Sequence, residues 1–79
     1  MTREDYMCQK LGSLSNFDKL LVEKMVEQLG EWATIEEVAK YFKRHKNTIY
    51  DKVEGGEVLN RRIGNKILIY TRSLIFLME

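Results

Sequence analysis

TIEEVAKYFKRHKNTIYDKVEGGEVLNRRIGN, from Thr34 to Asn65, is the stretch that decides the fold of this chain. Its first part predicts a helix, because Thr34 is an N-cap candidate and Glu37, three residues later, completes a capping box. The apolar residues that follow have the i, i+3, i+4, i+7 spacing of one helix face and are Ile35, Val38, Ala39 and Phe42. We therefore expect a short helix that buries one face.

A second helix is predicted after a polar interruption. The run Lys43-Arg44-His45-Lys46 breaks the apolar stripe and indicates a turn. The stripe resumes at Ile49 and Val53, four residues apart, which favours a helix from about His45 to Glu54. Gly55-Gly56 marks its end, because glycine readily takes the left-handed conformation that closes many helices.

A β-hairpin is expected next. Two β-rich runs, Arg61-Arg62-Ile63 and Ile67-Leu68-Ile69-Tyr70, flank the turn residues Gly64-Asn65-Lys66. A three-residue loop would pair Ile63 with Ile67 on one inward face, whereas a two-residue loop would scatter the isoleucines over both faces. We therefore predict a two-stranded antiparallel hairpin with a three-residue loop.

The first 30 residues predict an N-terminal helical extension ahead of a unit formed by residues 31–79. Thr2, with Asp5 three residues later, forms a capping box for a short first helix. A longer helix, Phe17–Leu29, begins after a Ser-Asn cap and ends at a glycine. The predicted fold class is thus α+β, mostly helical, with one hairpin.

The Phe17–Leu29 helix has a wider apolar arc than one small core requires. Its apolar residues form two stripes, Phe17-Leu21-Met25 and Val22-Val26-Leu29, and Leu20 lies beside the first. Two interpretations follow. Either one stripe faces a second subunit, which would make the protein a homodimer through this helix, or the monomer buries the whole arc.

Composition favours one small domain without catalytic or metal chemistry. The chain has 79 residues, of which 44% are hydrophobic. Its single cysteine and single histidine cannot form an internal disulfide or a structural zinc site. There is no glycine-rich phosphate loop and no nucleophile near a base. We therefore expect no enzyme activity, no metal and no cofactor.

The sequence shows no membrane or export signal. Its longest apolar run, Leu74 to Met78, is far shorter than a membrane span, and the first residues have no apolar signal-peptide region. We therefore expect a cytoplasmic protein that makes no membrane contact.

Charge is distributed unevenly along the chain. Residues 1–42 contain five Lys/Arg and eight Asp/Glu, a net charge of −3, whereas residues 43–79 contain eight and four, a net +4, and together these give the overall +1. The basic part holds the turn, the second helix and the hairpin. This is the pattern expected if those elements face nucleic-acid phosphates.

The segments TIEEVAKYF, NTIYDKV, GGEV and RRIGNKILIYTRSL resemble the small winged helix-turn-helix domains of the excisionase family, relatives of the MerR DNA-binding domain. The resemblance covers roughly residues 32 to 78. Its most specific parts are Ala39, Thr48-Ile49-Tyr50, Gly56-Glu57 and Arg62-Ile63-Gly64. The resemblance implies a winged helix-turn-helix that binds duplex DNA, with the hairpin as the wing.

Two positions depart from the family pattern. The family usually has a Gly-Val-Ser turn where this chain has Lys43-Arg44-His45, and it commonly has a basic residue where this chain has Asp51. The turn is thus more polar than the family's, and one expected phosphate contact is acidic.

The predicted DNA contacts lie on the turn, the second helix and the hairpin. In the second helix, Asn47 can pair with adenine and Lys46 can donate to guanine, whereas the Tyr50 hydroxyl is expected at a phosphate. His45 is expected either as the N-cap of this helix or near a phosphate. The full predicted set is Lys43, Arg44, His45, Lys46, Asn47, Thr48, Tyr50, Lys52, Arg62, Asn65 and Lys66.

Two roles remain open on the sequence alone. The resemblance implies sequence-specific binding of double-stranded DNA, either to direct an integrase toward excision or to regulate transcription of a mobile element. The alternative is a protein-protein interaction module that keeps the winged-helix scaffold without DNA binding. In that case the Phe17–Leu29 helix, Leu68 and Tyr70 would form the partner surface.

Overall fold

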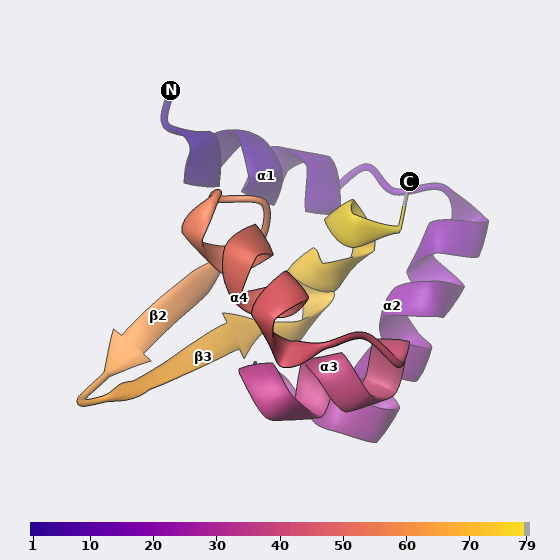
Figure 1. Cartoon of the computed structure of the whole chain (residues 1–79). Helices are drawn as coiled ribbons and strands as arrows, with labels where there is room; N and C mark the ends of the chain where they lie inside the picture. Colours follow the sequence, from indigo (N-terminus) through magenta and orange to yellow (C-terminus); the bar gives the residue numbers. More distant parts are fainter. Residues whose placement is uncertain (79) are drawn as a thin grey trace.

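The computed structural model of the protein describes residues 1–78, and Figure 1 shows how its elements are arranged. In chain order they are α1 (Arg3–Leu11), α2 (Asn16–Leu29), β1 (Trp32–Thr34), α3 (Ile35–Phe42), α4 (Lys46–Glu54), β2 (Asn60–Ile63), β3 (Lys66–Tyr70) and a 3-10 helix, η1 (Thr71–Leu77). The protein is therefore α+β and mostly helical, as predicted. The helix η1 was not predicted.

Local side-chain chemistry sets where the helices begin. Thr2 Oγ1 accepts a hydrogen bond from the Asp5 N–H at 3.0 Å, and Thr34 Oγ1 accepts one from the Glu37 N–H at 3.2 Å. In both helices the acidic side chain accepts a hydrogen bond from the N–H of the cap residue in return. Both predicted capping boxes are thus confirmed.

The end of α4 is also confirmed. Gly56 has a φ of 71°, a left-handed conformation that glycine adopts without steric cost. The Gly56 N–H donates to the Val53 carbonyl at 3.0 Å, and the Glu57 N–H donates to the Lys52 carbonyl at 3.1 Å. These two bonds form the Schellman motif, which ends the helix and directs the chain toward β2.

The sheet has three antiparallel strands in the order β1-β3-β2, so the prediction of two strands is wrong. The missed strand, β1, pairs with β3 so that Ala33 lies opposite Ile69. Three residues are too few to show an alternating pattern, and the strand that stabilises them is distant in the sequence. Trp32 lies in this strand, with its ring centroid 5.3 Å from that of Tyr70.

The hairpin closes with a two-residue loop, so the predicted three-residue loop is also wrong. Ile63 pairs with Lys66, which leaves Gly64-Asn65 as the loop. The glycine alone has a positive φ, 61°, which is the pattern of a type II′ turn. Ile63 therefore faces away from Ile67 and is 66% exposed. The turn chemistry, and not the burial of every isoleucine, sets the register.

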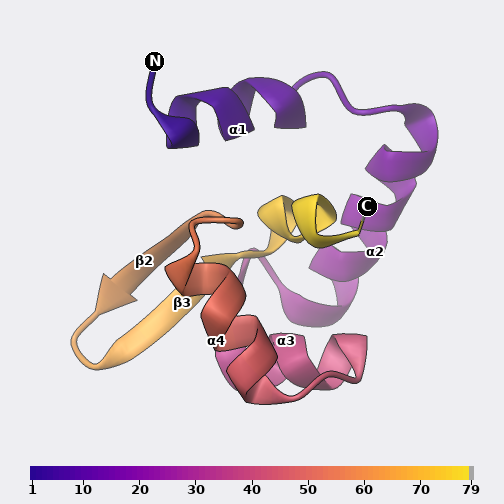
Figure 2. The same ribbon diagram turned by 45° about the horizontal axis from the view of Figure 1, so that its top comes forward.

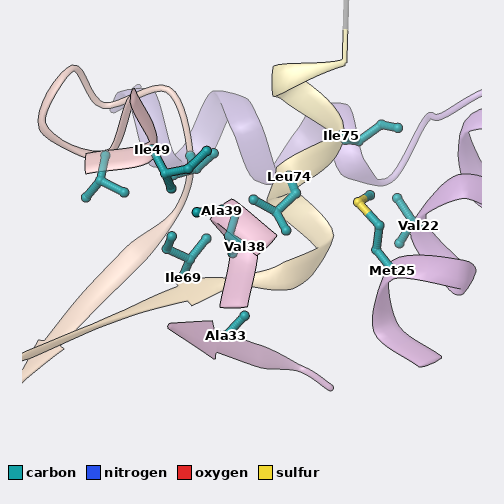
Figure 3. Packing of buried hydrophobic residues seen from close by; sticks show 11 residues of the cluster. Val22, Met25, Ala33, Val38, Ala39, Ile49, Ile69, Leu74 and Ile75 are labelled. Carbon is teal, nitrogen blue, oxygen red and sulfur yellow. The ribbon is translucent and has the colours of Figure 1, made fainter. Parts of the chain in front are cut away.

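One hydrophobic core joins the helices to the sheet, and Figure 3 shows its packing. Met25 of α2 lies near Leu74 and Ile75 of η1, which connects the first 30 residues to the rest of the chain. The core cluster consists of Val22, Met25, Ala33, Val38, Ala39, Ile49, Val53, Val58, Ile69, Leu74 and Ile75. Leu74 and Ile75, from the apolar C-terminal run, are thus buried in the core as part of η1.

α2 buries one face and exposes another. Val22 is 4% exposed and Met25 1%, whereas Phe17 is 68% exposed and Leu20 59%. Each of the two apolar stripes predicted from the sequence therefore contains one buried residue, Met25 in the first and Val22 in the second. The face of α2 that packs on the core includes part of both stripes. The large apolar side chains that remain outside the core on this helix are Phe17 and Leu20.

Candidate nucleic-acid interface

A groove of about 370 Å³ lies between the first turn of α3, the N-terminal half of α4 and the tip of the β2–β3 hairpin. Figures 1 and 2 show the hairpin projecting from the helices with its tip free. The lining residues are Thr34, Ile35, Glu36, Lys46, Asn47, Tyr50, Asn65, Lys66 and Ile67. The structure thus brings together five of the predicted DNA contacts, from two elements that are apart in the sequence.

The orientation of α4 follows from its two core residues. Ile49 and Val53 are buried against the core, so the opposite side of the helix faces outward. Lys46, Asn47 and Thr48 in its first turn are accordingly exposed. These three side chains are therefore accessible to a partner.

His45 is the N-cap of α4, which was one of its two predicted places. Its Nδ1 accepts a hydrogen bond from the Asn47 N–H at 3.1 Å. The bond satisfies a backbone donor that would otherwise have no partner at the start of the helix. His45 therefore helps to fix the turn of helix that carries Asn47.

The turn between α3 and α4 is held by its backbone. Lys43 has a φ of 56° and lies in the left-handed region, where a side chain is unusual outside glycine and asparagine. The Arg44 N–H donates to the Ala39 carbonyl at 2.9 Å, which closes the end of α3. The residue in this conformation is a lysine, and it is exposed.

Four of the predicted cationic contacts have no acidic partner within residues 1–78. The ion pairs of that part of the chain involve other basic side chains. The four are Lys43, Arg44, Lys46 and Lys66, and all are exposed. They are therefore able to meet phosphates without first breaking an ion pair.

Two other predicted contacts are already paired with acids. Arg62 Nη2 lies 2.7 Å from Glu54 Oε1, and Lys52 Nζ lies 3.5 Å from Glu57 Oε1. The two acids lie at the C-terminal end of α4 and in the loop that follows it. Among the predicted DNA contacts, the cations without an ion pair within residues 1–78 therefore lie in the turn before α4, at the start of α4 and at the hairpin tip.

A third ion pair ties α1 to the hairpin. Arg61 donates to both carboxylate oxygens of Glu4, at 2.7 and 3.2 Å. This hydrogen bonding and the arginine charge hold the pKa of the Glu4 carboxyl below its ordinary value of 4.5. The Arg3 Nε also donates to the Gly56 carbonyl at 2.6 Å. Together these contacts fix α1 against the loop that leads into β2.

The sequence did not identify every groove residue. It missed the α3 side, formed by Thr34, Ile35 and Glu36. Thr34 pairs with Leu68 in the sheet, which places the first turn of α3 beside the hairpin. That long-range pairing has no local signal in the sequence.

Comparisons of the chain with protein-family models, with curated proteins and with solved structures found no match. In the described part of the chain, no helix is both long and apolar enough to cross a membrane. Residues 1–78 also contain no cluster of three or more His, Cys, Asp or Glu side chains placed as metal ligands.

Proposed function

We propose that the protein binds duplex DNA sequence-specifically, as a winged helix-turn-helix in which α3 and α4 are the helix pair and the hairpin is the wing. The N-terminal half of α4 enters the major groove, which is wide enough for a helix. The hairpin tip lies on the neighbouring backbone or minor groove. One observation carries the proposal: Lys46 and Asn47 of α4 line the same groove as Asn65 and Lys66 of the hairpin.

The groove suits one strand of the DNA backbone. Lys46 and Lys66 flank it with positive charge, and Tyr50, which is 43% exposed, lines the surface between them. Cations and hydroxyl groups are common phosphate contacts in protein–DNA complexes. A strand held there would bring the bases beside it toward Asn47, whose amide can donate to and accept from adenine.

Glu36 limits where that strand can lie. Its carboxylate is on the α3 side of the same groove and is exposed, so it would repel a phosphate placed next to it. The strand is therefore expected on the side of Lys46 and Lys66. Acidic positions at a DNA surface commonly favour one orientation by disfavouring others.

The biological role follows the resemblance of the sequence. We propose a cytoplasmic regulator of a mobile element, acting in recombination beside an integrase or in transcription. The charge pattern supports DNA as the partner, because four cations without an ion pair within residues 1–78 lie in the turn before α4, at the start of α4 and at the hairpin tip.

A second candidate is a protein-protein interaction module built on the same scaffold. Phe17 and Leu20 favour it, because both are largely exposed on α2. This candidate requires no affinity for nucleic acid. DNA binding at low salt therefore separates the two.

The test is fluorescence anisotropy with a random-sequence duplex at low ionic strength. The wild-type protein should bind, and Lys46→Ala should bind more weakly because one phosphate contact is lost. Lys10→Ala, which removes the same charge from exposed α1, is the matched control and should bind as the wild type does. Absence of binding by the wild type would refute DNA binding and favour the interaction module.

A further inference from the structure

The outer face of α2 has the features of a protein contact. Leu20 points away from the buried Val22 and Met25, and Phe17 lies one turn before it. Leu20 borders a hollow of about 550 Å³. The other residues that line this hollow are Glu23, Lys24, Val26, Glu27 and Arg72. With both Phe17 and Leu20 exposed, the outer face of α2 is more apolar than a helix face that contacts only water needs to be.

We propose that this face is a homodimer interface, in which α2 packs antiparallel against α2 of a second copy about a two-fold axis near Leu20. The proposal is independent of DNA binding. In such a two-fold contact the same surface serves both copies, so every contact occurs twice. A single helix from each copy makes a small interface, and the dimer should therefore be weak and depend on concentration.

The charges of α2 select a second copy as the occupant. At 100° per residue, Lys19 and Glu23 lie on one side of Leu20, and Phe17 and Lys24 lie on the other. In the antiparallel pair, Lys19 of each copy meets Glu23 of the other, and Phe17 packs on the aliphatic part of the opposite Lys24. The surface is thus complementary to itself.

The ion pairs within one chain leave the charges of Lys19 and Glu23 available for a second copy. Lys24 Nζ lies 3.5 Å from Glu27 Oε2, whereas Lys19 and Glu23 form no ion pair within residues 1–78. In Figures 1 and 2, α2 lies on the side of the molecule away from the hairpin. A dimer through α2 would therefore leave the hairpin and α4 of both copies accessible.

A charge-exchange experiment tests the pairing by sedimentation equilibrium up to about 1 mM protein, a concentration at which weak dimers form. Lys19→Glu places like acidic charges together in its own dimer, and Glu23→Lys places like basic charges together. Each variant alone should dimerise about tenfold more weakly than the wild type. An equimolar mixture should recover dimerisation, because the two variants are complementary to each other.

A second pair of variants tests the apolar contact. Leu20→Asp should be monomeric, with a circular dichroism spectrum like that of the wild type because Leu20 lies outside the core. Ile63→Asp changes an equally exposed residue on the hairpin and should leave the dimer intact. A monomeric wild type, a dimeric Leu20→Asp, or a mixture of the charge variants no stronger than its components would overturn the proposal.

Discussion

Replacing Asn47 by alanine isolates the base-reading part of the proposed interface. Asn47 is the second residue of α4, is exposed and lines the groove between that helix and the hairpin. Its backbone N–H, not its side chain, forms the cap hydrogen bond with His45, so the cap survives the substitution. Alanine is also the better helix former. The variant therefore loses the carboxamide while α4 keeps its structure.

The expected loss depends on the DNA sequence. A bidentate amide–adenine contact contributes about 1–3 kcal/mol of discrimination, which corresponds to a loss of about 5- to 150-fold on the preferred site. Binding to random duplex should change little, because no charge is removed. Lys66→Ala is the contrasting variant: it should weaken binding to both duplexes and make the salt dependence shallower by about 0.9.

The assay is a binding titration at fixed salt with two duplexes, one selected from a randomised pool by the wild-type protein and one of random sequence. Circular dichroism verifies that the helices of the variant are intact. Equal losses on both duplexes, with helicity preserved, would show that Asn47 does not read bases. The assignment of α4 as the recognition helix would then be wrong.

Three further predictions concern charge and stability. Glu54→Gln should release Arg62 from its 2.7 Å ion pair and add one phosphate contact, which would steepen the salt dependence by about 0.9. Glu27→Gln, which removes the same charge and releases Lys24 on α2, should leave the salt dependence unchanged. Met25→Ala should lower the free energy of unfolding by about 2–5 kcal/mol in urea titrations, because Met25 is 1% exposed in the core. The ion pair with Arg61 lowers the pKa of the Glu4 carboxyl from 4.5, so the pair should stabilise the fold above pH 4.5 and stop doing so as the pH falls through the lowered pKa. Glu4→Gln should therefore have a lower melting temperature than the wild type at neutral pH. In strong acid the two melting temperatures should be the same.

The parts of the fold with local causes could be predicted from the sequence. The start of α3 depends on two side chains three residues apart, Thr34 and Glu37, and the end of α4 depends on one glycine pair. The third strand could not be predicted, because β1 exists only through its pairing with β3. The hairpin register was misjudged because burial of Ile63 was given more weight than the conformation of Gly64.

The candidate site also has parts that could be predicted from local sequence and parts that depend on long-range contacts. The outward position of Lys46 and Asn47 follows from the spacing of the two core residues of α4, which the sequence shows directly. The pairing of Arg62 with Glu54 depends on where β2 lies beside the end of α4. Glu36 lines the groove because Thr34, two residues before it, pairs with Leu68 in the sheet. Neither of these long-range effects has a signature in residue spacing.

The salt dependence of DNA binding tests the central claim most directly. Four cations, Lys43, Arg44, Lys46 and Lys66, are exposed and have no acidic partner within residues 1–78. At about 0.9 per neutralised phosphate, the logarithm of the affinity of the wild-type protein for a random duplex should fall with the logarithm of salt concentration with a slope of about −3.6. A slope indistinguishable from zero would contradict a phosphate-facing surface on α4 and the hairpin.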